Sequence, residues 1–535
     1  MADKYSISNT AQELIAIFKR SYQDKEIGGS KDEPKVKIHE TIGKVAYAYE
    51  KIRNAVDYQE EHLLRKNAVG RMLKRRLLSK ERGSVIAEPL IRELIRAGYL
   101  PNDYFPERRI SDIERIISKY VSLIDLTVNQ TNLTKKNKTL SWIISVASFE
   151  IEQYFSPTIR DDAMVEAMYK IIRPNIDLHN EFFNTEDQDI QVYIAMHRSL
   201  IKSDTAMLRY HLIHYYAPDW RYITPEEIPA FAAKLPHLML RIDQQINNKL
   251  SDRLFTHMKK FAPLFTVLKD VLQQNPESAE QILDNPKLLA EKVNQACQKR
   301  YADASAKLSR GIIRSIIYIL LTKTILAFVL ELPYEAFVIK KIKLLPLAIN
   351  VAFHPFLMFL IATSIRVPAE KNTHKITQGV YEIVYDLAEK EILAKREETF
   401  RGSRLMNALF SLFYFVAYFV TFGLIIWGLR LLEFSIVSGF LFMFFLSVIS
   451  FFGLRLRNTA KELVILDKRE GALVIVFDFF ALPIIRVGRW ISRKTSKVNI
   501  FMFILDFIIE APFKVLIETV EDWVSFQRQK KDETF

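Results

Sequence analysis

Two acidic residues within apolar runs near the C-terminus are the first residues whose surroundings suit chemistry. Asp478 and Asp506 each follow an apolar run and precede a phenylalanine, and Glu510 lies one turn after the second. Each segment continues with a short apolar run, a proline and a basic residue, which makes a weak internal duplication. An ionisable side chain at membrane depth is a candidate for handling an ion, a proton or a lipid headgroup. The alternative is structural, with each aspartate capping a half-helix or pairing with a neighbouring cation.

Three more polar residues interrupt apolar segments upstream. Arg314 and Lys323 fall within 311–332, and His354 falls within 344–365. A charge at the centre of a spanning helix costs about 2.5–3.5 kcal/mol on insertion scales. We therefore expect acidic or aqueous surroundings for these side chains, with Glu331 and the C-terminal acids as available partners.

Two groups of basic residues are candidates for binding anionic lipid headgroups or an acidic partner. One group ends a long predicted helix, and the other separates the two duplicated segments. They are Arg71, Lys74, Arg75, Arg76, Arg489, Arg493, Lys494 and Lys497. Nucleic acid is the competing partner, but residues 65–82 contain no aromatic side chain on which a base could stack. A plain solvated face is the remaining alternative.

Motifs of common enzyme classes are absent. The sequence has no glycine-rich phosphate loop, no nucleophile elbow and no dinucleotide fingerprint. His39 begins a zinc-protease pattern, but Gly43 stands where the second histidine is required. His211 and His214 lie one turn apart near His197, yet a metal site would also need carboxylates at helical spacing. We therefore predict core or surface histidines, no metal, no cofactor and no catalytic residue.

Composition favours a helical membrane protein. Hydrophobic residues make up 49% of the chain, and the uncharged apolar runs crowd its C-terminal part. The 15 glycines and 19 prolines are few for 535 residues, which argues against disorder and turn-rich β folds. Cys297 is the single cysteine, so no intramolecular disulfide forms. The net charge of +13 suits contact with anionic headgroups, and the N-terminus lacks the apolar core of a signal peptide.

The pattern predicts an all-α protein in four parts. These are a cytoplasmic helical domain over 1–285, a stalk helix over 286–310, a transmembrane bundle over 311–470, and a membrane-embedded or interfacial helix pair with a polar tail over 471–535. The expected spans are 311–332, 344–365, 405–429 and 434–454. An amphipathic cytoplasmic helix over 373–400 separates the second span from the third.

The distribution of lysine and arginine predicts that both chain ends are cytoplasmic, in a prokaryotic plasma membrane. Four spans then leave Lys340, Lys341 and Lys343 outside, which violates the positive-inside rule. A reading in which the first two segments dip into the membrane without crossing therefore stays open. The basic linker 489–497 favours a final pair that stays in the cytoplasmic leaflet.

The leading functional expectation is a non-enzymatic scaffold that presents its cytoplasmic helical domain to a protein partner at the inner membrane face. The alternative is a transporter or channel component that uses Asp478, Asp506 and Lys323, because broken membrane helices often build ion sites. An enzyme acting on lipid is a third option. The sequence does not indicate an oligomeric state.

Overall fold

A computed structural model of the chain consists of helices, and no strand occurs among the residues that it describes. Those residues are 6–23, 33–38, 47, 50–51, 53–54, 63–78, 83–128, 133–176, 185–365, 370–385, 387, 392–393, 404–460, 464–465, 472–497 and 523. The predicted all-α class is confirmed. The chain forms two compact units: the membrane unit (1–11, 174–179 and 259–499) and the helical unit (12–173, 180–258 and 500–535). The domain limits expected from the sequence stay predictions.

The helical unit is built around one apolar core. Its helices are α3 (Leu64–Leu78), α4 (Gly83–Arg96), α5 (Ile110–Val128), α6 (Leu133–Phe155), α7 (Ile159–Ile172), α8 (Thr185–Leu200), α9 (Thr205–Tyr216), α10 (Ile228–Ile246) and α11 (Lys249–Met258). Apolar residues recur at helical spacing, as in Ile86, Leu90 and Leu94 of α4, and all three are buried. Trp220 is buried at one end of the core, where it stacks on Phe231.

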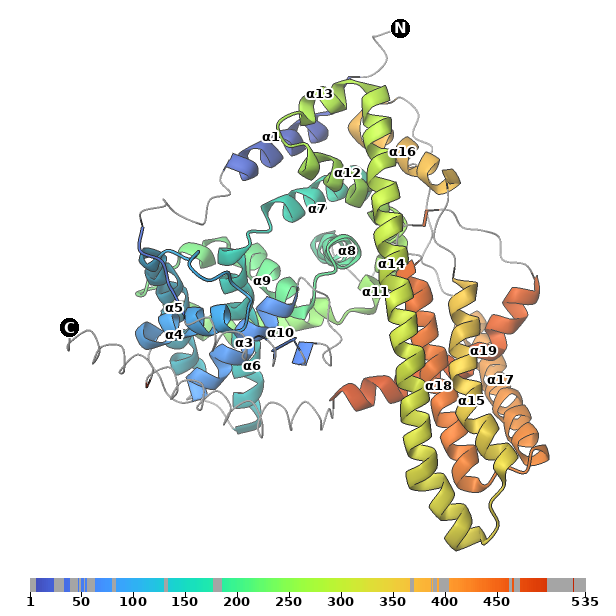
Figure 1. The fold of residues 1–535 in the computed structure, drawn as a ribbon. Coiled ribbons are helices and arrows are strands. Elements are labelled where there is room, and N and C mark those ends of the chain that lie inside the picture. Colours follow the sequence, from blue (N-terminus) through green and yellow to red (C-terminus); the bar gives the residue numbers. More distant parts are fainter. Residues whose placement is uncertain are drawn as a thin grey trace, which may run out of the picture. The chain divides into compact units, whose positions relative to one another are not determined.

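The membrane unit is organised along one long helix. Its elements are α12 (Ala262–Gln274), α13 (Ala279–Asp284), α14 (Pro286–Leu326), α15 (Leu344–Ser364), α16 (Glu370–Val384), α17 (Arg404–Leu431), α18 (Ile436–Ala460) and α19 (Ala472–Lys497). Figure 1 shows α14 running beside α15 and α18. Helix α1 (Asn9–Gln23) crosses the boundary between the two units.

Helix α14 begins where its capping residues predict. Asn285 accepts hydrogen bonds from the backbone of Lys287 and Leu288 at 3.1 and 3.3 Å, and Pro286 occupies the first turn. At 1.5 Å per residue, its 41 residues extend over about 60 Å. The helix then continues as two π-helical stretches, 327–331 and 334–339, on either side of Pro333. Proline has no backbone N–H, so the regular hydrogen-bond ladder is interrupted there.

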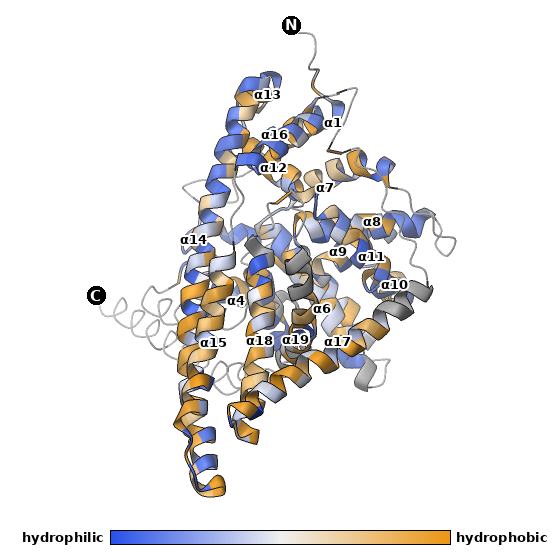
Figure 2. Cartoon of the chain, turned by 90° about the vertical axis from the view of Figure 1, so that its right-hand side faces the viewer, coloured by the Kyte–Doolittle hydropathy of each residue, from blue (hydrophilic) through white to orange (hydrophobic). Residues whose placement is uncertain are grey.

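Four helices are long and apolar enough to cross a membrane. They are Pro286–Ile339, Leu344–Ser364, Ser411–Leu431 and Ile436–Arg457. Figure 2 shows apolar residues along α15 and along the part of α14 beside it. Each of the four expected spans falls on one of these helices, so the architecture is compatible with a membrane protein.

Helix α16 carries the predicted apolar stripe but is shorter than expected. Ile376, Val380 and Ile383 are buried against the neighbouring α12 and α14. The expected helix ran from 373 to 400, whereas α16 ends at Val384. The Glu382 carboxylate accepts hydrogen bonds from the backbone N–H groups of 392 and 393, which follow the end of the helix in the chain.

The N-terminal segment is part of the membrane unit. The Ser8 backbone N–H donates to the Val384 carbonyl at 2.8 Å, and the Ser8 hydroxyl donates to the Ile383 carbonyl at 3.0 Å. Ile7 and Tyr385 form an isolated antiparallel bridge beside them. The first described residues of the chain thus lie against the end of α16.

Helix α19 covers the first half of the expected C-terminal pair. It runs unbroken through Pro483 and packs against α17 and α18. The Thr421 hydroxyl donates to the Phe480 carbonyl at 3.3 Å, and the Arg486 guanidinium lies 4.4 Å from the centre of the Tyr414 ring. The second helix of the expected pair lies outside the described residues.

Candidate functional site

Five polar side chains are buried together inside the helices that can cross the membrane. Lys323 comes from α14, Glu331 from the π-helical stretch that follows, Asn350 and His354 from α15, and Ser438 from α18. Each is at most 1% exposed. We call these five residues the polar cluster. Their position makes the polar cluster the candidate site of the membrane unit.

Asn350 links the two charged members of the polar cluster. The Lys323 ammonium donates to Asn350 Oδ1 at 2.7 Å, and Asn350 Nδ2 donates to Glu331 Oε1 at 2.7 Å. The Ser438 hydroxyl donates to the other carboxylate oxygen of Glu331 at 3.0 Å. The positive and negative charges thus offset each other through a bridging amide.

The π-helical turn explains how one chain segment supplies both charges. Lys323 and Glu331 are eight residues apart, which in a regular α-helix leaves their directions about 80° apart around the axis. One α turn of 3.6 residues and one wider π turn together take up about eight residues. Residues 327–331 form that wider turn, so both side chains face Asn350.

His354 joins α15 to α18 at the same depth. Its Nδ1 lies 3.1 Å from the Asn350 carbonyl oxygen, and its Nε2 lies 3.0 Å from the Phe442 carbonyl oxygen. A carbonyl oxygen only accepts, so a neutral ring makes one of these hydrogen bonds and an imidazolium makes both. The Lys323 ammonium also lies 4.4 Å from the centre of the Phe445 ring, which adds a cation–π contact.

A second buried acid lies near the end of the first span. Glu335 is 1% exposed, and one of its carboxylate oxygens accepts the backbone N–H of Lys343 at 2.9 Å. The other oxygen has no hydrogen-bond partner among the described residues. Glu335 therefore holds the turn that leads into α15.

The sequence identified part of this site. The structure brings Lys323 and His354 together with Glu331, the partner expected for Lys323. Arg314 is instead exposed on α14, and no described residue pairs with it. The Asp478 side chain, Asp506 and Glu510 lie outside the described residues, so their roles stay predictions.

Sequence reasoning missed Asn350 and Ser438. Uncharged polar residues are common in membrane helices, and no spacing marks these two as partners of Lys323 and Glu331. The interruption of an apolar run at Asn350 was the one available signal.

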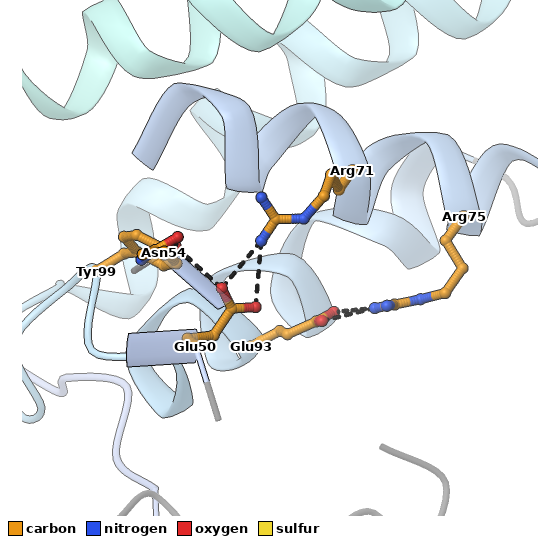
Figure 3. Close-up of polar contacts among 6 residues, drawn as sticks. All are labelled: Glu50, Asn54, Arg71, Arg75, Glu93 and Tyr99. Atoms are coloured by element: carbon orange, nitrogen blue, oxygen red, sulfur yellow. Dashed lines mark hydrogen bonds and ion pairs between the residues drawn. The ribbon is translucent and has the colours of Figure 1, made fainter. Parts of the chain in front are cut away.

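Most of the first basic group makes ion pairs within the helical unit (Figure 3). Arg71 contacts Glu50 at 3.0 Å, and Arg75 and Arg76 contact Glu93 at 2.6 and 3.3 Å. Both carboxylates are buried, and the Tyr99 hydroxyl donates to Glu50 as well.

Lys74 is exposed on the same helix, and Arg489 is exposed on α19. The side chains of Arg493, Lys494 and Lys497 lie outside the described residues. Binding of anionic lipid by the basic groups stays a prediction.

The helical unit contains a second polar group, formed by Asp162, His197 and His211. One ligand atom from each residue lies within 4.8 Å of the other two, an arrangement that can hold a metal ion. Burial raises the pKa of the Asp162 carboxyl to about 7 and lowers the pKa of His211 to about 4. Burial and the neighbouring His211 lower the pKa of His197 well below its ordinary value. Sequence reasoning missed Asp162, because it lies on α7 while His197 lies on α8 and His211 on α9.

Comparisons of the chain with protein families, with characterised proteins and with solved structures find no match. The architecture itself defines the class of protein. It combines four helices able to cross a membrane, a buried polar cluster among them, and a separate compact helical unit.

Proposed function

We propose that the chain is an integral membrane scaffold, in which the membrane unit anchors the chain and the helical unit binds a protein partner in the cytoplasm. The observation that carries this proposal is the saturation of the polar cluster. Lys323 and Glu331 are both buried, and both have partners in the same cluster.

A saturated cluster favours anchoring over transport. A side chain that takes up and releases an ion needs contact with water at some stage, and the five members are 0–1% exposed. A buried polar network whose members are paired with one another instead fixes one packing of the helices that carry it. The hydrogen bonds join α14, α15 and α18, so the cluster stabilises the bundle as an anchor.

One observation favours a second candidate, a proton or cation transporter. π-helical turns inside α-helices occur frequently at functional sites, and residues 327–331 form one between Lys323 and Glu331. Three ionisable side chains then lie at membrane depth in one hydrogen-bonded group, which is also how proton pathways are built.

Reconstitution separates the two candidates. We expect the purified full-length chain to give no proton or potassium flux in liposomes above that of protein-free liposomes. Photo-crosslinkers on exposed positions of the helical unit should capture one defined cytoplasmic protein in cells. Flux that disappears in Lys323→Met but persists in Arg314→Met would overturn the scaffold proposal and establish the transporter.

A further inference from the structure

Three buried polar atoms of the helical unit converge without a hydrogen-bond partner. They are Asp162 Oδ1, His197 Nε2 and His211 Nε2, and none has a partner among the described residues. His211 Nε2 lies 3.7 Å from Asp162 Oδ1, which is too long for a hydrogen bond. Buried polar atoms are normally satisfied, so three that point at one spot indicate a ligand there.

The surrounding residues hold Asp162 in position. The Thr158 hydroxyl donates to Asp162 Oδ2 at 2.7 Å, and it accepts in turn from the Gln153 side-chain amide at 2.7 Å. The side-chain amide oxygen of Gln153 accepts a hydrogen bond from the Thr158 backbone N–H at 3.0 Å, so the two residues are joined by two hydrogen bonds. One oxygen of Asp162 is thus fixed, and the other remains available to a ligand.

His197 is held by its surroundings in a comparable way. His197 Nδ1 lies 3.3 Å from the Ser203 hydroxyl, so its Nε2 faces the shared spot. The His197 ring packs between Tyr193 and His211, with ring centres 4.3 and 4.5 Å away. A hydrogen bond to the far nitrogen of a histidine is the usual support of a metal ligand, because it fixes the tautomer and the ring orientation.

We propose that Asp162, His197 and His211 bind one divalent first-row transition ion, for which Zn²⁺ is the probe. Two imidazole nitrogens and one carboxylate oxygen are a ligand set that such ions accept. Three protein ligands leave at least one coordination position for water or another small molecule, as in zinc sites that are not purely structural. The Asp162 side chain is 41% exposed, which gives the ion a path from solvent.

Packing by itself does not account for this geometry. Stacked core histidines need no carboxylate between them, and an ion pair would bring Asp162 and His211 into hydrogen-bond contact. A buried water molecule is the strongest competitor, since it also needs two to four polar partners. The three ligand atoms lie within 4.8 Å of one another. Zn–N distances of about 2.0–2.1 Å require these atoms to move closer together, whereas a bound water molecule does not require this movement.

The test uses the full-length chain in detergent, after treatment with a chelator. Equilibrium dialysis against Zn²⁺ should give one bound ion per chain, and Co²⁺ in its place should show visible absorption bands of a low-symmetry site. Asp162→Asn keeps the size of the side chain, and we expect it to weaken Zn²⁺ binding at least 100-fold. Thr158→Val leaves all three ligands in place and should weaken binding by about 10–100-fold, as losses of supporting contacts do.

His237→Ala is the matched control, because His237 is exposed on α10 of the same unit. Binding should be unchanged in this variant. Circular dichroism of each variant establishes that it is folded before the affinity is compared. Zn²⁺ binding that is absent in the wild type, or equal in Asp162→Asn and His237→Ala, would leave a water site and overturn the proposal. Neither outcome bears on the scaffold function.

Discussion

Lys343 and Glu433 form an ion pair in the membrane unit, with 2.9 Å between the Lys343 ammonium and the Glu433 carboxylate. Lys343 directly precedes α15, and Glu433 lies between α17 and α18. The two turns therefore lie at the same end of the bundle. This arrangement is the one that four crossing helices produce, and it opposes a first pair that only dips into the bilayer. In the topology predicted from the basic residues this end is the outer side, where Glu433 would offset the charge of Lys343.

The ion pair yields a prediction about topology. Lys343→Cys and Glu433→Cys, each in a chain with Cys297→Ser, should both react with a membrane-impermeant thiol reagent in intact cells. The double-cysteine chain should form a disulfide on mild oxidation, because the two side chains meet. Reaction at one position without the other would contradict four crossings.

Cys297 itself is 1% exposed, so the native thiol should react slowly from either side of the membrane. The wild-type chain therefore serves as the unreactive control of this experiment. Fast reaction of Cys297 in the folded wild type would contradict the burial of this side chain in the first half of α14.

A second prediction concerns Lys323. Lys323→Met should destabilise the membrane unit by about 3–5 kcal/mol, because it leaves Asn350 and the buried Glu331 carboxylate without their cation. Thermal unfolding in detergent measures this loss. Arg314→Met removes a charge from the same helix at an exposed position and should change stability far less. Equal losses in the two variants would show that the polar cluster does not stabilise the bundle.

A third prediction concerns the contact between α18 and α19. A Cβ atom at Gly488 would overlap the Ser447 carbonyl oxygen, so Gly488→Ala should push the two helices apart and cost about 1–3 kcal/mol. Gly428 lies in α17 with nothing within 4 Å of a Cβ, so Gly428→Ala should be neutral or slightly stabilising through helix propensity. Equal stability of the two variants would exclude the close approach of α19 to α18.

A fourth prediction concerns acid sensitivity of the chelator-treated chain. His197 and His211 have lowered pKa values in the folded state, so the unfolded chain binds more protons below the ordinary histidine value of 6.5. Their contribution to stability is full above that pH and is lost as the pH falls toward about 4, the pKa of His211.

Asp162 acts with the opposite sign. Its pKa is raised from 3.8 to about 7, so the folded state binds the extra proton, and stability rises as the pH falls through that window. Asp162→Asn should therefore steepen the loss of stability between neutral pH and pH 4, and His211→Gln should flatten it. The unfolding midpoint against pH measures both slopes, and identical slopes in all three chains would contradict the assignment.

The membrane helices were predictable because their signal is local. An uncharged run of about 20 residues has few alternatives to a spanning helix, and Asn285 followed by Pro286 marks the start of α14 without tertiary information. The end of α16 has no comparable local signal: Tyr385, which follows it, forms a bridge with the distant Ile7, and Glu382 binds backbone groups of residues 392 and 393.

The candidate sites were predictable only in part, because their residues are brought together by contacts between distant segments. Lys323 and His354 stand out against apolar neighbours, but Asn350 matters only because a π-helical turn brings Glu331 to the same face. His211 and His214 were visible as a pair near His197, whereas Asp162 lies 35 residues from His197 and 49 from His211, on another helix. Contacts between distant helices are fixed by packing, which spacing along the chain does not encode.

The contact of Ser8 with the end of α16 has a consequence for biosynthesis. A sequence separation of 375 residues lies between Ser8 and Ile383, so the ribosome must produce residues 12–258, which hold the described helices of the helical unit, and two membrane segments before the contact forms. Domains emerging during synthesis generally fold as units, N-terminal first. The first residues of the nascent chain therefore lack this contact until α16 is translated. By then residues 12–258 have already left the exit tunnel.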